Sequence, residues 1–199
     1  MTATFLLIRH AMHADFDIRL SGRRPGVALS PAGVAQAAAL GRRLAAAGIT
    51  RVVASPLERT MATAAAIAQG CGLAPPEPVE ALTELDLGEW TGEALDALHD
   101  DPRWRVWNEQ RGTACAPGGE SMAEAAARIT GWLRATAAAF PDQTIAVVTH
   151  SDMVRGAVAQ VLGLPLDHLC SFDVDPASVS TVVMGDWGAR LLNLNVTAG

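Results

Sequence analysis

Short apolar runs alternate along this chain with longer stretches in which apolar residues recur at helical spacing. Each apolar run has the length of a strand that is buried on both faces. Strands are predicted over residues 4–8, 51–54, 144–149, 179–184 and 190–194. Helices are predicted over residues 31–47, 56–69, 122–140 and 151–162. This alternation indicates an α/β fold built on a mostly parallel sheet.

Three serines stand where helices are expected to begin. Ser30 precedes a proline that would occupy the first helical position, where its fixed backbone angle suits a helix. Ser55 and Ser121 are each followed, three residues later, by a glutamate, Glu58 and Glu124. That spacing is typical of a capping box. The pattern therefore predicts a side-chain N-cap at all three serines.

Residues 93–118 interrupt the alternation, because they hold two tryptophans and several charges without a strand-like run. We interpret this segment as a small helical cap insertion. Trp104 and Trp107 would either close over a pocket or pack the cap onto the sheet, and the sequence leaves both open. There is no internal repeat and no low-complexity linker. We expect one domain over residues 1–199, a three-layer α/β/α sandwich with a mostly parallel central sheet.

Composition and charge narrow the class of protein. The chain carries 21 acidic and 15 basic residues, a net charge of −6, which argues against a general affinity for nucleic acid. Lysine is absent, so any anion site must be a local cluster of arginines. No apolar run approaches the roughly 20 residues of a membrane span. We therefore expect neither a nucleic-acid nor a membrane partner.

Cysteine usage and the N-terminal segment bear on the compartment. The three cysteines are far apart and show no metal-binding or redox spacing. They are Cys71, Cys115 and Cys170. Because the N-terminal residues also lack the pattern of a signal peptide, we expect a cytoplasmic protein with reduced thiols.

Candidate chemistry gathers where predicted strands end. Arg9 and His10 follow the first strand, and His150 follows the strand over residues 144–149. Arg59 lies in the first turn of a helix that also follows a strand. Ligands of open α/β sheets bind at the carboxyl ends of the strands, and both helix N-termini and arginines favour phosphate. These residues predict one pocket for an anion.

Six motifs occur in a fixed order over nearly the whole chain. They are Leu7–Ala11, Leu29–Gly33, Ser55–Thr60, Glu84–Gly92, Pro117–Ser121 and Thr149–Ser151. The ordered set resembles the histidine phosphatase superfamily, the phosphoglycerate mutase-like family. The resemblance implies a phosphomonoesterase of the histidine acid phosphatase type. It would hydrolyse a small phosphorylated metabolite through a phosphohistidine, with no metal and no other cofactor.

The resemblance also implies a role for each matching residue. His10 would be the nucleophile, and Arg9, Arg59 and His150 would hold the phosphoryl group. Glu84 would protonate the leaving oxygen. These roles are physically consistent, because nearby arginines keep a histidine neutral and a dianionic substrate raises the pKa of a carboxyl group. The arginines would also stabilise the phosphoryl oxygens during transfer.

Four further residues are expected to contact the substrate. Ser151 follows His150 directly. The loop arginines Arg19, Arg23 and Arg24 suggest that the substrate carries a second anionic group. A solvent-exposed loop that contacts no substrate would show the same sequence pattern.

Several residues compete for these roles. Asp86 and Glu89 are alternatives to Glu84 as the acid. His13 forms a His-x-x-His pair with His10, but no third ligand is evident, so no metal site is expected. At Phe16 the mutases of the family carry an asparagine, so this phosphate contact is either missing or supplied by another residue such as Arg19, Arg23 or Arg24.

Two other functions stay open beside the phosphatase. A phosphoglycerate mutase is disfavoured by Phe16 and by the short segment between Gly92 and Pro117, where mutases usually carry a longer insertion. A catalytically silent phospho-ligand binding module is disfavoured because every expected catalytic position is filled. The substrate is left open among phosphoglycerate, α-ribazole phosphate, sugar phosphates and nucleotides. A homodimer is expected only as the common default.

Overall fold

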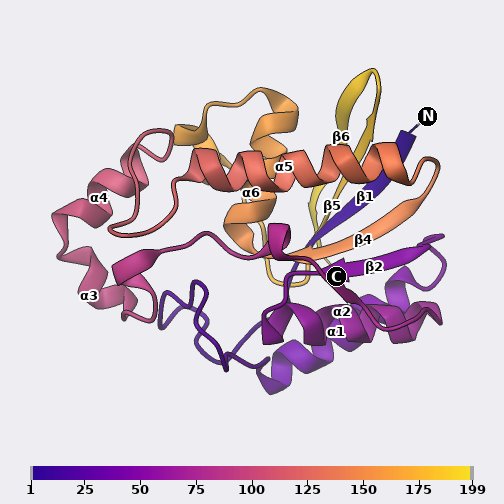
Figure 1. Ribbon diagram of the computed structural model, residues 1–199. Helices are drawn as coiled ribbons and strands as arrows, with labels where there is room; N and C mark the ends of the chain where they lie inside the picture. The colour runs from indigo at the N-terminus through magenta and orange to yellow at the C-terminus, as the bar shows by residue number, and fades with distance from the viewer. Residues whose placement is uncertain (1, 198–199) are drawn as a thin grey trace.

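A computed structural model describes residues 2–197 of the chain, with a six-stranded sheet at its centre (Figure 1). The strand order is β3-β2-β4-β1-β5-β6. The strands are β1 (Thr2–Arg9), β2 (Arg51–Ala54), β3 (Glu77–Pro78), β4 (Thr144–Thr149), β5 (Val179–Gly185) and β6 (Gly188–Val196). Strands β1 to β4 run parallel to one another. Strand β5 runs antiparallel to β1, and β6 runs antiparallel to β5. The mostly parallel sheet predicted from the sequence is confirmed.

Helices cover both faces of this sheet, which gives the predicted three layers (Figure 1). They are α1 (Pro31–Leu44), α2 (Glu58–Cys71), α3 (Leu95–His99), α4 (Pro102–Glu109), α5 (Met122–Ala139) and α6 (Ser151–Leu162). Three short 3₁₀ helices are η1 (Glu80–Leu82), η2 (Gly88–Trp90) and η3 (Leu166–Ser171). The pair α1 and α2 lies on one face of the sheet, and α5 and α6 lie on the other.

The side chains of strand β1 show why helices must cover both faces of the sheet. Its successive side chains point to opposite faces, and all of residues 5–8 are buried. Phe5 and Leu7 belong to the apolar cluster beneath α5 and α6, whereas Leu6 and Ile8 belong to the cluster beneath α1 and α2. A continuous apolar run of this kind can be satisfied only between two layers.

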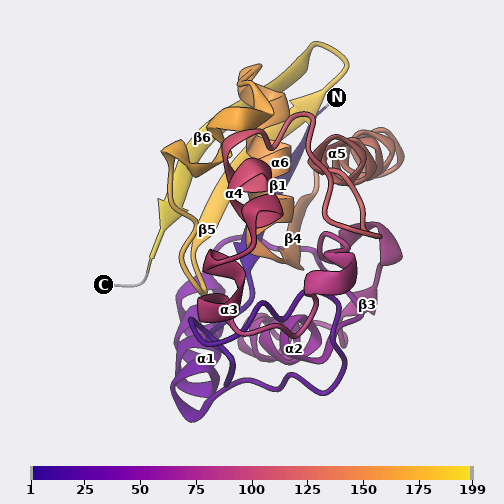
Figure 2. The ribbon, with the colours of Figure 1, turned by 90° about the vertical axis from the view of Figure 1, so that its left-hand side faces the viewer.

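The helical segment predicted over residues 93–118 is present as α3 and α4, which lie at one end of the sandwich (Figure 2). Three tryptophans join it to the body of the molecule. Trp107, in α4, is almost fully buried and stacks on Trp104 with ring centroids 5.0 Å apart. Trp90, in η2, meets both rings edge-on. Packing of the cap onto the body is therefore one role of Trp104 and Trp107.

Two of the three predicted helix caps are confirmed, and one is wrong. The side chains of Ser30 and Ser121 accept backbone hydrogen bonds at the starts of α1 and α5, and Ser121 forms a full capping box. Ser55 does not cap α2, which begins at Glu58 with Leu57 in the cap position. The reason lies in tertiary structure, because the Ser55 hydroxyl is 2.8 Å from Nε2 of buried His150.

Smaller differences concern element ends and one strand. The helix predicted over residues 31–47 ends at Leu44. The two-residue strand β3 was not predicted, because it holds a proline and pairs only with β2 at the sheet edge.

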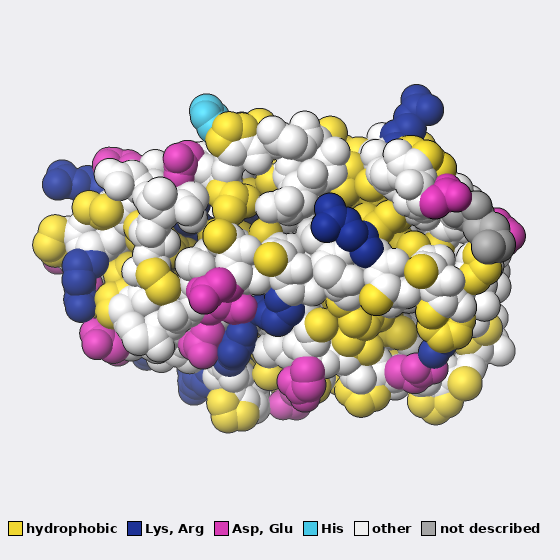
Figure 3. Space-filling model, turned by 45° about the horizontal axis from the view of Figure 1, so that its top comes forward, with side chains coloured by type: hydrophobic (Ala, Val, Ile, Leu, Met, Phe, Trp, Pro, Cys, Tyr) yellow, Lys and Arg dark blue, Asp and Glu magenta, His cyan; other side chains and the backbone are white. Residues whose placement is uncertain are grey.

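The surface agrees with the mixed charge of the sequence. On the face in Figure 3, acidic and basic side chains are interspersed and are not gathered by sign. Cys71, Cys115 and Cys170 are all free thiols. Within residues 2–197, no helix combines the length and apolar composition that crossing a membrane requires.

Candidate active site

Three neighbouring parallel strands end at the same edge of the sheet, and each delivers a polar residue there. Arg9, the last residue of β1, is in register with Thr149 of β4, and Ala54 of β2 is in register with Val148. His10, Ser55 and His150 therefore follow at adjacent positions. The helices α2 and α6 begin at this edge, so their N-terminal turns face the same space.

A cavity of about 220 Å³ opens at this edge. It is lined by the sheet edge, the loop after β1, the cap and α6. Among the predicted site residues, its lining includes Arg9, His10, Arg19, Arg59, Glu84 and Ser151. The ring of His150 lies next to that of His10, with centroids 5.2 Å apart.

His10 is held in one tautomer. Its Nδ1 lies 2.8 Å from the carbonyl oxygen of Ala11, which can only accept, so Nδ1 carries the proton. Its Nε2 accepts a hydrogen bond from Nε of Arg59 at 3.3 Å. Burial, followed by the charge of Arg59, holds the pKa of His10 well below its usual value. The ring is therefore neutral and presents an Nε2 lone pair next to a guanidinium group.

Arg59 is buried in the first turn of α2 and joins the two histidines. Its Nη2 donates to the Gly22 carbonyl at 2.6 Å and lies 3.3 Å from Nδ1 of His150. The side-chain hydrogen bonds of Arg59 go to imidazole nitrogens and a carbonyl group, and none goes to a carboxylate of the described residues.

Arg9 approaches the cavity from the end of β1. Its Nη1 donates to the Val174 carbonyl at 2.7 Å, and its guanidinium lies over the ring of Phe16, 5.2 Å from the centroid. Burial lowers the pKa of Arg9, which nonetheless stays charged as arginines do in proteins. Its buried Nε has no partner within residues 2–197. Arg9 therefore retains donor capacity for an anion.

His150 has the opposite tautomer to His10. Its Nδ1 accepts from Arg59, so Nε2 carries the proton and donates it to the Ser55 hydroxyl. Burial and the charge of Arg59 hold the pKa of His150 well below its usual value. Glu84 Oε2 lies 3.9 Å from Nδ1. Because the imidazole is neutral, this contact is not an ion pair.

Glu84 lines the same cavity with a carboxyl group that readily holds a proton. Burial, reinforced by the negative charge of Asp152, raises its pKa to about 7. The Leu85 N–H, which donates to Oε1 at 2.9 Å, and the two site arginines oppose this shift without cancelling it. A carboxyl group of this pKa can act as both acid and base near neutral pH.

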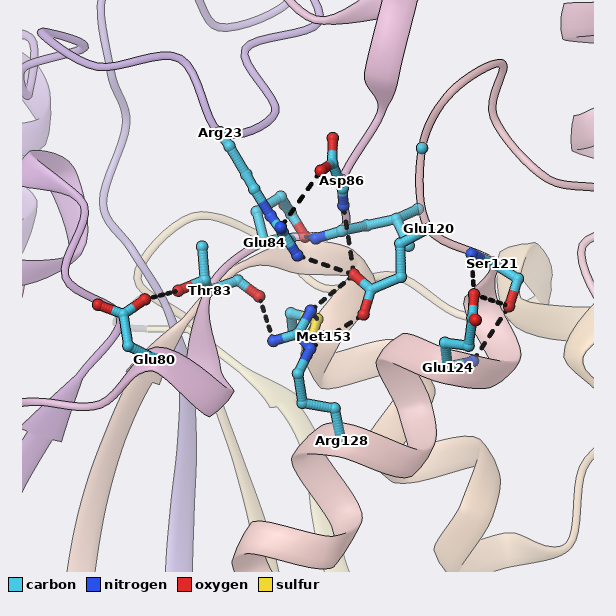
Figure 4. Close-up of polar contacts among 12 residues, drawn as sticks. Arg23, Glu80, Thr83, Glu84, Asp86, Glu120, Ser121, Glu124, Arg128 and Met153 are labelled. Atoms are coloured by element: carbon cyan, nitrogen blue, oxygen red, sulfur yellow. Dashed lines mark hydrogen bonds and ion pairs between the residues drawn. The ribbon is translucent and has the colours of Figure 1, made fainter.

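The loop that carries Glu84 is held in place by a network of ion pairs (Figure 4). Glu120 accepts from Nη2 of Arg23 at 2.9 Å and from Nη2 of Arg128 at 2.8 Å. Arg128 in turn donates to the carbonyl groups of Ala81 and Thr83. Arg23 donates from Nε to the carbonyl of Glu84 at 2.8 Å.

This network corrects part of the prediction for the loop arginines. Arg23 contacts the backbone of Glu84 from outside the cavity, and Arg24 pairs with Asp15 at 3.1 Å on the surface. Neither lines the cavity, so the structure does not bring these two residues to the candidate site. Arg19 does line it and donates to the Gly92 carbonyl.

The alternatives weighed against Glu84 lie elsewhere. Asp86 accepts from Arg23 and from the Gly88 N–H, and Glu89 pairs with Arg103 on the surface. Neither lines the cavity. His13 does, and burial lowers its pKa to about 4. Within residues 2–197, no group of histidine, cysteine and acidic residues has the arrangement of a metal site.

Sequence reasoning missed four charged residues that line the cavity. They are Asp17 from the loop after β1, Arg111 from the cap, and Asp152 and Arg155 from α6. The positions of Asp152 and Arg155 could have been anticipated, because both lie within the first two turns of the helix that follows His150. Nothing in the sequence around Arg111 marks it, because its place depends on how the cap folds back.

Comparison with known proteins adds independent information. The family model of the histidine phosphatase superfamily, branch 1, matches residues 5–197. The chain is 31% identical to phosphoserine phosphatase 1 of Hydrogenobacter thermophilus, over 96% of this chain and 92% of that protein. It is 34% identical to a probable phosphoglycerate mutase, GpmB, of Cronobacter sakazakii, over 80% of this chain and 74% of that protein.

Solved structures share the fold. The mycobacterial glucosyl-3-phosphoglycerate phosphatase superposes with a TM-score of 0.88 at 24% identity, covering 99% of this chain and all of that one. At this identity the likeness speaks for the fold alone.

Proposed function

The chain belongs to the histidine phosphatase superfamily, branch 1, and from this premise we propose that it hydrolyses a small phosphomonoester through a phosphohistidine at His10. One observation carries the proposal. A neutral His10, with its Nε2 lone pair beside two arginines, shares a cavity with Glu84, whose pKa is about 7. Nucleophile, anion cradle and proton donor are thus present together.

In the first half-reaction, Nε2 of His10 attacks phosphorus and the bond to the ester oxygen breaks. Glu84 gives its proton to that oxygen, and the product alcohol leaves. Arg9 and Arg59, which line the cavity, stabilise the equatorial oxygens of the phosphoryl group, and His150 joins them by turning its Nε2–H from Ser55 to a phosphoryl oxygen. The Ala11 carbonyl continues to accept from Nδ1, which stabilises the positive charge that the ring acquires.

In the second half-reaction, the Glu84 carboxylate takes a proton from water as that water attacks phosphorus. The bond between phosphorus and Nε2 breaks, inorganic phosphate forms, and His10 returns to its neutral state. Glu84 regains its proton, which completes the cycle. The arginines supply the positive charge, so we propose a metal-independent enzyme of the histidine acid phosphatase type.

A phosphatase is favoured over a mutase by Phe16. Where the family's mutases place an asparagine, this cavity has an aromatic ring packed against the Arg9 guanidinium. The ring offers no hydrogen bond to a phosphate that must be retained between half-reactions. The relative named as a phosphoserine phosphatase matches more of the chain than the relative named as a probable mutase, which agrees with this choice.

Hydrolysis of p-nitrophenyl phosphate tests the proposal. We expect turnover that falls at least about a thousand-fold in His10→Ala, because the nucleophile is removed. His168→Ala is the matched control, since His168 is an exposed histidine in η3. Acid-labile phosphate on the wild-type chain, absent from His10→Ala, should appear by mass spectrometry during turnover.

Two outcomes would contradict the proposed phosphatase activity. Interconversion of 3- and 2-phosphoglycerate with little phosphate release would identify a mutase. Binding of phosphoesters without any turnover would identify a binding module.

We also propose a domain organisation, a cellular location and an oligomeric state. We expect a single domain with a cap over about residues 93–118 and a cytoplasmic location, which the three free thiols support. A homodimer stays a prediction from general frequency.

A further inference from the structure

The proposed reaction places a positive charge on the His10 ring, and the carbonyl group of Ala11 is the acceptor that stabilises this charge. When Nε2 attacks phosphorus, the ring becomes a cation while Nδ1 keeps its proton. Nδ1 donates this proton to the Ala11 carbonyl oxygen at 2.8 Å. Burial and the charge of Arg59 lower the pKa of His10, and the hydrogen bond to Ala11 acts in the opposite direction. The orientation of this carbonyl group therefore bears on how readily the ring takes up charge.

The peptide unit between Ala11 and Met12 is held from its other side by Gln36. A peptide bond is planar and trans, so the Ala11 carbonyl and the Met12 N–H point in opposite directions from one rigid plane. The Met12 N–H donates to Oε1 of Gln36 at 3.0 Å. A side chain that fixes this N–H also fixes the direction of the carbonyl group. Because hydrogen bonds in a chain polarise one another, Gln36 also increases the negative charge on the carbonyl oxygen.

Helix α1, which carries Gln36, lies directly against Met12. The Met12 carbonyl accepts from the N–H of Ser30 at 3.0 Å and from its hydroxyl at 3.3 Å. A Cβ atom added to Gly33 would overlap this carbonyl oxygen, so only glycine lets the helix approach so closely. Gln36 lies three residues beyond Gly33, on the same face of α1. Backbone contacts of the helix therefore set the position from which Gln36 reaches the Met12 N–H.

The peptide unit before Ala11 is held by a second side chain. The Ala11 N–H donates to Oγ1 of Thr63 at 3.0 Å, and the Thr63 hydroxyl donates to the Arg59 carbonyl at 2.8 Å. Thr63 belongs to α2, the helix that also brings Arg59 to Nε2 of His10. Both peptide units that flank Ala11 are thus bonded to side chains. Of these two bonds, the one from Gln36 acts on the peptide unit that contains the carbonyl group.

We propose that Gln36 is a positioning residue, which aims and polarises the Ala11 carbonyl and so stabilises the charge on the His10 ring during phosphoryl transfer. It acts through the Met12 N–H. Neither Gln36 nor Met12 lines the cavity, so the effect does not come from contact with the substrate. The bond from Nε2 to phosphorus forms as the bond to the ester oxygen breaks, and the Nδ1 proton stays in place. This inference rests on the proposed function, because it takes His10 to be the nucleophile.

The plain alternative is that Gln36 only fastens α1 to the loop after β1. A purely structural residue changes the melting temperature, whereas a positioning residue also changes the hydrogen bond from Nδ1 of His10. This proton is buried and hydrogen-bonded, so it should give a downfield signal in the proton NMR spectrum of the chain labelled with ¹⁵N-histidine. The signal is assigned by its absence from His10→Ala. Weakening of the hydrogen bond moves the signal upfield.

We expect Gln36→Met, which keeps the length of the side chain but removes the acceptor, to lower kcat/KM for p-nitrophenyl phosphate about ten-fold. The Nδ1 proton signal should move upfield. The inhibition constant of inorganic phosphate should stay near the wild-type value, because the groups that line the cavity are unchanged. Gln36→Glu should retain at least the wild-type kcat/KM, since a carboxylate oxygen still accepts from the Met12 N–H.

Gln69→Met is the matched control, since Gln69 is an exposed glutamine in the last turn of α2. Its kcat/KM and its Nδ1 proton signal should equal those of wild type. If Gln36→Met does not fold, Gln36→Asn takes its place, because it keeps the amide on a side chain that is one methylene shorter. The same two changes are then expected, in the same directions.

A kcat/KM of Gln36→Met equal to that of the control would overturn the positioning role and leave the proposed function standing. A loss of activity with an unmoved Nδ1 signal would assign Gln36 to structure alone and overturn the role as well. If the wild-type chain hydrolyses no phosphoester, the proposed function is wrong. The Nδ1 signal of Gln36→Met then still decides whether Gln36 acts on the His10 ring, and a signal at its wild-type position would refute that link.

Discussion

Burial shifts the pKa values of His10 and Glu84 in opposite directions, and both shifts favour the proposed chemistry. Burial disfavours the charged form of any side chain, which is the cation for an imidazole and the anion for a carboxyl group. The pKa of His10 is therefore held low and that of Glu84 is raised to about 7. Near neutral pH the nucleophile is therefore unprotonated while a large fraction of the acid still holds its proton.

The pH dependence of kcat/KM should reveal Glu84. For an alkyl phosphate, whose leaving group needs a proton, kcat/KM should fall above about pH 7 as Glu84 ionises in the free enzyme. With p-nitrophenyl phosphate, whose leaving group is good, the fall should be much weaker. Glu84→Gln should slow the alkyl ester more than the nitrophenyl ester. An equal loss with both esters would count against Glu84 as the acid.

Glu84 should also affect the free energy of unfolding, in the direction that its raised pKa sets. Its folded-state pKa of about 7 exceeds the usual value of 4.5, so the native protein retains a proton that the unfolded chain releases. Stability is therefore lost as pH rises from about 4.5 through 7. In urea titrations at pH 8, Glu84→Gln should unfold with a free energy about 3 kcal/mol higher than wild type. At pH 4.5 the difference should vanish, and a gain at both values would point to another cause.

At the scale of elements, a loop carries the proposed acid and neighbouring elements hold that loop. Glu120 precedes α5 and joins Arg23 of the loop after β1 to Arg128 of α5. Through these arginines it is linked to the carbonyl groups of Thr83 and Glu84. Glu120 is thus a positioning residue, which acts on the reaction only through Glu84.

Glu120→Gln should loosen this loop. We expect kcat/KM for an alkyl phosphate to fall about ten-fold, because hydrogen bonds to two charged partners are weakened. The descending limb of its pH profile should move, since the surroundings of Glu84 change. Glu124→Gln, in the first turn of α5, is the control, as glutamine still fits a capping box. A lower melting temperature with an unchanged pH profile would show that Glu120 is only structural.

At the scale of the whole molecule, the cavity lies between the body and the cap, and its shape depends on how firmly the two are joined. The stacked pair Trp104 and Trp107 lines the cavity and also packs against Trp90. Both readings of these tryptophans from the sequence are therefore compatible with the geometry. Arg111 rests on the same cluster.

If the chain is one domain, disrupting this cluster should weaken the entire fold. Trp107→Ala should lower the free energy of unfolding by about 3–5 kcal/mol, because a large side chain is removed from a packed site. Trp187→Ala, at a residue that is 56% exposed, should have little effect on the free energy of unfolding.

Urea unfolding of the wild-type chain, followed by circular dichroism and by fluorescence, should give one coincident transition. Two separate transitions would show that the cap folds independently of the body.

Most of the architecture and the central residues of the candidate site could be predicted from the sequence, because their signals are local. An apolar run such as residues 144–149 indicates a buried strand, and the residue after a parallel strand must lie at its carboxyl edge. His10 and His150 are therefore placed together by the sequence alone. Arg59 is placed with them by the helix that follows the second strand, and the resemblance adds Glu84.

Tertiary structure alone decided what each of the remaining side chains contacts. Ser55 has the local pattern of a helix cap, but its hydroxyl accepts from the buried Nε2–H of His150 and α2 begins only at Glu58. Arg23 and Arg19 stand in one loop, yet one holds the Glu84 backbone and the other lines the cavity. Arg111 reaches the cavity only because the cap folds back over α6. Such contacts join residues far apart in the chain, and no local pattern records them.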